Sequence, residues 1–197
     1  MTNASHQVEL ACYAKVNLVL RVLRLRADGY HEIDSLLQNI ALADRVTIRR
    51  ATTGRTLTVE GLPAPTDQSN LCLRALHVLE RSVGAPCRVQ IHLHKGIPSA
   101  AGLGGGSADA AAVLLGVNSL LNLGLSEEEL VSLAAQVGSD VPAMILGGAV
   151  LVGGRGEKCR RLPPLRPLEI VIAKPQSGLA TPDVYQWWDE RPLTSPT

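Results

Sequence analysis

A loop rich in small residues, GIPSAAGLGGGSADA at residues 96–110, follows a strand-like stretch and leads directly into an alanine-rich helix. Gly104, Gly105 and Gly106 permit positive φ angles, and they let backbone N–H groups approach an oxyanion with no Cβ in the way. A helix N-terminus adds unpaired N–H groups and a partial positive charge. The pattern predicts a phosphate-binding loop, with a merely flexible loop as the alternative. Ser107 can cap the helix or place its hydroxyl on a phosphate-bound Mg²⁺.

Two common phosphate loops are excluded by the residues around these glycines. A P-loop needs the pattern G-x-x-x-x-G-K-[ST], and no lysine follows the glycines here. A dinucleotide-binding turn needs G-x-G-x-x-G directly after a strand, but Ser107 stands where its last glycine belongs. What remains is a P-x-x-x-G-L-G-G-G-S loop that opens a helix, in which the backbone supplies the contacts.

The elements that hold this loop are predicted from hydrophobic spacing. Strands are expected at residues 16–25, 44–50, 55–61, 87–95, 149–154 and 168–174. Helices are expected after a Ser69 cap, at 108–124, at 126–138 and at the start of the tail. Ser126 and Glu129 form a capping box for the third of these helices. The order predicts the α+β class, a mainly antiparallel sheet with helices on one face.

Composition narrows the partner classes. The 197 residues suit one large domain, or one domain with part of a second, and a formal net charge of +1 gives no field for nucleic acid or a membrane surface. No apolar run approaches the roughly 20 residues of a membrane span. The four cysteines are far apart, which predicts buried, reduced thiols. With no signal or transit pattern, the expected location is cytoplasmic.

Four stretches together resemble a known family. The loop and helix PSAAGLGGGSADAAA is similar to the second motif of the galactose, homoserine, mevalonate and phosphomevalonate kinases. Three other stretches resemble the 4-diphosphocytidyl-2-C-methyl-D-erythritol kinases within that group. They are YAKVNLVLRVLRLRADGYHEIDSLLQNIALAD, VGSDVPAMILGGAVLVGGRGEK and AKPQSGLATPDVY. The resemblance runs from Ala11 to Tyr185. It implies transfer of the ATP γ-phosphate to a hydroxyl of the cytidine-diphosphate-linked methylerythritol, an isoprenoid precursor, with ATP and Mg²⁺ as cofactors.

The resemblance also implies a domain division. Residues 1–162 correspond to the ATP-binding N-terminal domain of these kinases, which is of the left-handed β-α-β type. Residues 163–197 correspond to the start of their C-terminal domain, and the remainder of that domain is absent from the sequence. In the family the active site lies between the two domains, so this chain is expected to supply one wall of it.

Catalytic roles follow from the matched motifs. Asp140, in G-S-D-V-P, is implied as the base that accepts the hydroxyl proton, with a helix N-cap as its alternative role. Lys15 is costly in an apolar stretch unless its charge is paired. Beside Asp140 it would keep the carboxylate ionised and offset charge on the phosphoryl group. The alternative is an edge-strand lysine that points to solvent. Asn17 shares a strand face with Lys15 and is expected to orient the substrate.

Ligand contacts are implied in the same way. Tyr30 and His31 would bind the cytosine, with Tyr185 as the opposite face of the stack and Thr181 nearby. Asn70 is expected near the adenine, and Lys95 either reaches a phosphate or serves as an ordinary strand-end lysine. The remaining ATP and phosphate contacts fall on Pro98, Ala101, Gly102, Leu103, Gly104, Gly105, Gly106, Ser107 and Ala108.

Some features depart from the family or point elsewhere. Ala108 stands where the family usually has a second serine, which places more of the Mg²⁺ or phosphate contact on Ser107. His92 and His94 share a strand face, but without a third ligand nearby they indicate a solvated face rather than a metal site. Two other hypotheses stay open. One is a non-catalytic nucleotide-binding or interaction module that self-associates through an uncovered domain face. The other is a different kinase of the same group.

Overall fold

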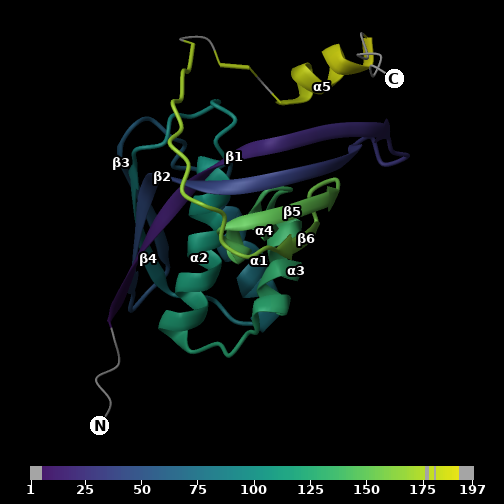
Figure 1. Cartoon of the computed structure of the whole chain (residues 1–197). Coiled ribbons are helices and arrows are strands. Elements are labelled where there is room, and N and C mark those ends of the chain that lie inside the picture. Colours follow the sequence, from purple (N-terminus) through teal and green to yellow (C-terminus); the bar gives the residue numbers. More distant parts are fainter. Residues whose placement is uncertain (1–5, 176–177, 180, 191–197) are drawn as a thin grey trace.

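The computed structural model describes residues 6–175, 178–179 and 181–190. Six strands form one sheet in the order β3-β4-β2-β5-β6, and β1 pairs with β2 (Figure 1). All neighbouring pairs are antiparallel except β3 and β4, which are parallel. The expected mainly antiparallel sheet is therefore confirmed. The strands are β1 (Gln7–Leu25), β2 (His31–Arg50), β3 (Arg55–Gly61), β4 (Val89–Lys95), β5 (Ala149–Gly154) and β6 (Lys158–Arg161).

A long, bent hairpin of β1 and β2 is the central feature of the sheet. The two strands stay paired from Gln7 opposite Arg49 to Leu25 opposite His31. The register shifts at three places along β1, between residues 13 and 15, 17 and 19, and 22 and 24. Such irregularities bend a strand and re-aim side chains. The sequence predicted only the C-terminal parts of both strands, residues 16–25 and 44–50, because polar residues interrupt the apolar pattern in the earlier part of each strand.

The parallel pair is joined by a helix, so β3, α1 (Leu71–Val83) and β4 form a β-α-β unit. β4 shows the predicted alternation: Val89, Ile91 and Leu93 are buried, and the residues between them are exposed. The apolar face of β4 packs against the helices, while His92 and His94 face outward beside Glu60. The handedness expected for this unit stays a prediction.

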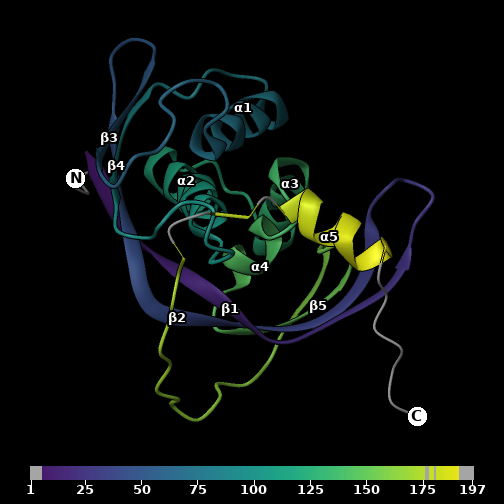
Figure 2. The same cartoon turned by 90° about the horizontal axis from the view of Figure 1, so that it is seen from above.

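Four helices cover one face of the sheet (Figure 2). These are α1, α2 (Gly105–Leu121), α3 (Glu127–Val137) and α4 (Val141–Leu146). The main core lies between them and the inner sides of β1, β2 and β4. α2 lies close to the sheet at Gly116, where a Cβ would lie 2.7 Å from Ile48 Cδ1. The predicted capping box of α3 is confirmed, with Ser126 and Glu129 bonded to each other's backbone N–H groups.

Several sequence-based boundaries are wrong. Asn70, not Ser69, caps α1: its side chain accepts from the N–H of Cys72. Ser69 instead donates to the carboxylate of Asp67. α2 begins at Gly105 with Gly104 as its cap, so Ser107 lies inside the first turn. Residues 168–174 form no strand. They have no pairing partner among the described residues, and Val171 is 97% exposed.

The chain after β6 crosses the face of the sheet opposite the helices and returns to the glycine loop, where Gly178 approaches Ala100 (Figure 2). The last described element is α5 (Thr181–Glu190), in agreement with the helical start predicted for the tail. No helix in the described part of the chain is long and apolar enough to span a bilayer. The four cysteines are free thiols, and Cys12, Cys72 and Cys87 are buried. The cytoplasmic location inferred from them stays a prediction.

Candidate active site

Three distant parts of the sequence meet at the mouth of α2. The backbone N–H of Lys15 donates to the carbonyl of Leu103 at 2.9 Å, which ties β1 to the glycine loop. The Lys15 side chain then runs past Gly104, where a Cβ would lie 2.9 Å from Lys15 Cγ. Lys15 Nζ ends 3.6 Å from Asp140 Oδ2, at the start of α4. An ammonium, a carboxylate and a helix N-terminus therefore converge on one place.

Lys15 is held by a chain of side-chain hydrogen bonds. Its Nζ donates to Asn17 Oδ1 at 2.7 Å, and Asn17 Nδ2 donates to Ser35 Oγ at 2.7 Å. The hydroxyl of Ser35 in turn donates to the carbonyl of Val19. The Lys15 side chain is only 9% exposed, so the alternative of a solvent-facing lysine is wrong. Sequence reasoning missed Ser35, whose signal was a serine among the apolar residues of β2.

Asp140 occupies the N-cap position of α4 but does not act as a cap with its side chain. Its backbone carbonyl accepts from the N–H of Met144, while its carboxylate makes no capping hydrogen bond. The side chain is 42% exposed and faces Lys15. The carboxylate is therefore available to a second molecule, which a capping aspartate would not be.

Of the three glycines singled out in the sequence, only Gly104 has a positive φ, while Gly105 and Gly106 are the first residues of α2. Gly102 and Gly104 have φ angles of +69° and +68°, a region that side-chain-bearing residues rarely adopt. At Gly104 there is also no room for a side chain, because a Cβ would lie 2.7 Å from Met144 Cε. As the first residues of α2, Gly105, Gly106 and Ser107 have N–H groups with no partner inside the helix. Such a terminus suits the phosphates of a nucleotide.

Aromatic residues gather at the far end of the β1–β2 hairpin. The rings of His31 and Tyr185 are stacked with centroids 4.8 Å apart, and His31 Nε2 lies 2.8 Å from Asp189 Oδ1. Tyr30 is 48% exposed, and the guanidinium of Arg155 lies over its ring. Tyr185 thus faces His31, although the sequence predicted a stack shared with Tyr30. Thr181 begins α5, but its side chain lies outside the described residues.

Comparison with known proteins adds a family to this geometry. The profile described as GHMP kinases N terminal domain matches residues 70–148, which contain the glycine loop and Asp140. A protein from Moorella thermoacetica, named 4-diphosphocytidyl-2-C-methyl-D-erythritol kinase, is 49% identical over 187 residues. The chain contains a domain of the GHMP kinase family.

Two further relatives agree with this assignment. A protein of the same name from Pelotomaculum thermopropionicum is 48% identical, over 88% of this chain and 61% of its own length. A crystal structure of 4-(cytidine 5'-diphospho)-2C-methyl-D-erythritol kinase superposes with a TM-score of 0.68 at 39% identity, over 79% of this chain and 55% of that one. The Moorella alignment covers 95% of this chain and 65% of the relative. The chain therefore spans less than two thirds of the length of these GHMP kinases.

Beneath the GHMP loop lies a buried cluster of three charges that changes the interpretation of Lys95. Lys95 Nζ contacts the carboxylate of Asp44 and lies 2.8 Å from Asp109 Oδ2 on α2. Asp44 Oδ1 also accepts from the N–H groups of Gly96 and Ile97 at 2.6 and 2.7 Å. Lys95 is 4% exposed and fully paired, so the expectation that it reaches a phosphate is wrong. It anchors the start of the loop from below.

Asn70 also has a structural role. Its Oδ1 accepts the N–H of Cys72, and its Nδ2 donates to the carbonyl of Pro65 at 2.6 Å. Both ends of the amide are therefore engaged in the cap of α1, and the residue is buried. Asn70 is therefore the cap of α1, and its expected position near the adenine stays a prediction, since each end of the amide can make one further hydrogen bond.

The buried cluster predicts a pH dependence of stability. Burial raises the pKa of Asp109 to about 7, against the opposing charge of Lys95. A carboxyl whose pKa is higher in the folded than in the unfolded chain binds more protons when folded. The free energy of unfolding therefore falls as pH rises from about 4 to 7. In Asp109→Asn this slope should be smaller, with a difference on the order of 1 kcal/mol per pH unit. Urea denaturation from pH 4.5 to 7.5 measures it, and parallel curves for the two proteins would contradict it.

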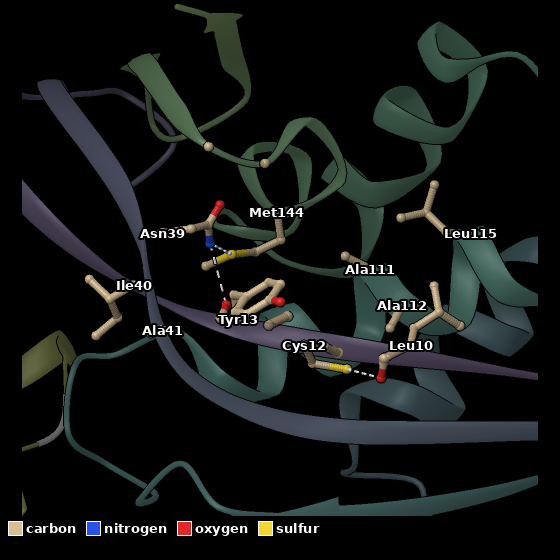
Figure 3. A pocket seen from close by; sticks show the side chains of 14 residues that line it. Leu10, Cys12, Tyr13, Asn39, Ile40, Ala41, Ala111, Ala112, Leu115 and Met144 are labelled. Carbon is tan, nitrogen blue, oxygen red and sulfur yellow. Dashed lines mark hydrogen bonds between the residues drawn. The ribbon is translucent and has the colours of Figure 1, made fainter. Parts of the chain in front are cut away.

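A separate apolar pocket of about 400 Å³ lies behind the loop (Figure 3). Side chains of β1, β2, α2 and α4 line it, and neither Lys15 nor Asp140 is among them. Asn39 lies at its edge, where its amide donates to the backbone carbonyls of Tyr13 and Ala14. Met144 lies between this pocket and Gly104. The pocket is therefore not where the ammonium and the carboxylate meet.

No group of three or more metal-ligating side chains occurs among the residues that the structure describes.

Proposed function

We propose that the chain carries the catalytic side of an ATP-dependent kinase that phosphorylates a hydroxyl of 4-diphosphocytidyl-2-C-methyl-D-erythritol. The observation that carries this proposal is the pairing of Lys15 and Asp140 at 3.6 Å beside the N-terminus of α2. The relatives at 49% and 48% identity bear the name of that kinase. ATP supplies the phosphoryl group that is transferred.

The proposed chemistry assigns one task to each group. The substrate hydroxyl oxygen attacks the γ-phosphorus, the bond from that phosphorus to the bridging β–γ oxygen breaks, and ADP leaves. Asp140 takes the hydroxyl proton, which typically contributes 10²–10⁴-fold in rate. Lys15 stabilises charge on the phosphoryl oxygens, and the free N–H groups of α2 hold the phosphates. Asn17 fixes the position of Lys15 and contacts the substrate. Ser107, in the first turn, is the proposed contact to Mg²⁺.

The other end of the substrate would lie against the aromatic residues of the hairpin. We propose that Tyr30, His31 and Tyr185 bind the cytosine, by stacking and by hydrogen bonds to its edge. Asp189 supports this role of His31, because a carboxylate on one ring nitrogen fixes the orientation of the imidazole. Ligand binding by Tyr185 would require its ring to share or leave the stack with His31.

The proposal keeps the domain division expected from the sequence. Residues 1–162 form the ATP-binding unit, and residues 163–197 begin a second one. In support, the sheet ends at Arg161, and residues 162–175 form neither helix nor strand. Exposed apolar side chains in this segment, including Leu168 and Val171, would suit a surface covered by further chain or by another copy.

Phosphorylation assays of the chain test the proposed function. The chain is incubated with ATP, Mg²⁺ and the cytidyl substrate, and in matched reactions with mevalonate or homoserine, while ADP and the phosphorylated product are measured. We expect ADP only with the cytidyl substrate. Turnover of mevalonate or homoserine instead would assign the chain to another kinase of the group. Nucleotide binding without turnover of any substrate would overturn the catalytic proposal in favour of a binding module.

A further inference from the structure

The turn between β5 and β6 connects the two ends of the site. Gly156 in this turn has a φ of +126°, and a Cβ there would lie 2.6 Å from the carbonyl oxygen of Ser139, the neighbour of Asp140. Gly154, at the start of the turn, pairs with Ile33 near the hairpin tip. Arg155 stands between these two contacts. One face of its turn therefore lies against the Asp140 region, and the other against the strand that carries His31.

The side chain of Arg155 leans toward the aromatic end. Its guanidinium carbon lies 4.8 Å from the centroid of the Tyr30 ring, a distance typical of a cation–π contact. Within the described part of the chain, no carboxylate oxygen lies within the 4.0 Å that defines an ion pair with this guanidinium. The contact with Tyr30 uses the flat face of the guanidinium, so the N–H donors around its edge can still bind another group. Arg155 is half-buried, so part of its side chain stays accessible to another molecule.

The neighbouring charges are already engaged with other groups. Asp28 is paired with Arg26 at 3.0 Å, and Arg26 also binds Glu32 at 3.1 Å. Glu157 accepts the backbone N–H of Arg155 itself at 2.7 Å. The pKa of Asp28 is lowered chiefly by its hydrogen bond from Arg26. The positive charge of Arg155 lowers it further by a smaller amount. At this end of the hairpin, Arg24 and Arg26 are paired with carboxylates and Arg155 is not.

The middle of the proposed substrate falls in this region. If the hydroxyl lies at Asp140 and the cytosine at Tyr30 and His31, the two phosphates of the substrate lie between them. The pKa of Tyr185 is raised mainly by burial and to a smaller extent by the negative charge of Asp140. Asp140 is therefore near enough to the aromatic end for its charge to act there. A planar guanidinium matches paired phosphate oxygens, because it can donate two parallel hydrogen bonds. We propose that Arg155 binds the diphosphate of the substrate and selects for diphosphate-linked cytidine. This inference rests on the proposed function.

Binding measurements with CDP and cytidine test this role. The wild-type chain and Arg155→Met are titrated with each ligand by calorimetry. We expect the substitution to weaken CDP binding at least about tenfold, since hydrogen bonds to charged groups are lost, and to leave cytidine affinity within about twofold. Arg155→Lys, which keeps the charge but not the fork, should recover part of the CDP affinity. The matched control is Arg160→Met, which removes the same charge from an exposed position on β6.

The outcomes separate the two proposals. If wild-type chain prefers CDP and Arg155→Met keeps that preference, the role of Arg155 is overturned while the proposed function stands. If CDP and cytidine lose affinity equally, Arg155 only supports the ring of Tyr30, and the inference is wrong. If the wild-type chain binds neither ligand, both the cytidyl substrate and the diphosphate contact are rejected.

Discussion

Asp140→Asn is expected to slow phosphoryl transfer by about 10²–10⁴-fold, the usual contribution of a general base. Asparagine has nearly the same shape as aspartate but cannot accept the hydroxyl proton. Because Asp140 is partly exposed but is the carboxylate partner of the buried Lys15 ammonium, the free energy of unfolding should fall by about 1 kcal/mol. Single-turnover phosphorylation with excess chain, together with urea denaturation, measures both quantities.

A second carboxylate provides the control for this prediction. Asp34 lies on β2, is more exposed than Asp140, and makes only a loose pair with Arg21 at 3.8 Å. Asp34→Asn removes the same charge from the surface and should leave the rate nearly unchanged. Equal rates for Asp140→Asn and the wild-type chain would remove Asp140 as the base. The glycine loop and Lys15 would then be the remaining catalytic groups.

Lys95→Met is expected to destabilise the fold by about 3–5 kcal/mol, because it leaves the buried carboxylates of Asp44 and Asp109 without a counter-charge. Burial alone would lower the pKa of Lys95, but the two carboxylates outweigh it and the pKa is raised. The ammonium is therefore charged at neutral pH and lies between the two carboxyl groups, of which Asp109 is partly protonated there because its pKa is about 7. The free energy of unfolding from urea denaturation at pH 7 measures the loss.

The matched control is Lys158→Met, at an exposed position of β6, which should cost less than about 0.5 kcal/mol. Adding Asp109→Asn to Lys95→Met removes one of the two stranded carboxylates and should restore part of the stability. A loss below about 1 kcal/mol for Lys95→Met would show that water or protonation compensates the carboxylates. The cluster would then not be the anchor of the loop.

Elements with a strict local pattern were predictable from the sequence. β4 alternates because one face meets the helices, and the α3 capping box depends only on residues three apart. The strand predicted at 168–174 failed because a strand needs a partner, and its apolar residues carry no information about one. α4 was missed because it has only six residues, too few to show a helical period. Ser69 and Asn70 are both good caps, and only geometry chooses between them.

The site was predictable to different degrees. A lysine inside an apolar stretch marked Lys15, but its meeting with Asp140, 125 positions later in the sequence, came only from the family resemblance. The role of Lys95 was wrongly predicted because alternation along a strand shows which face a residue is on, but not which side chains pack against that face. Asp109 could have been noticed as the one charge in an alanine-rich helix. Arg155 gave no sequence signal, since its importance depends on which carboxylates fail to reach it.

The continuous pairing of β1 and β2 has a consequence for substrate choice. Lys15 and Asn17 lie midway along this hairpin, and His31 lies near its tip. If the substrate binds as proposed, this single pair of strands sets the distance between its reacting hydroxyl and its cytosine. Each residue adds about 3.3 Å to an extended strand. The bends in the hairpin shorten the direct distance between Lys15 and His31. A shift by one residue would turn alternate side chains to the wrong face. A hairpin adapted to a longer or shorter substrate would therefore have to gain or lose residues two at a time.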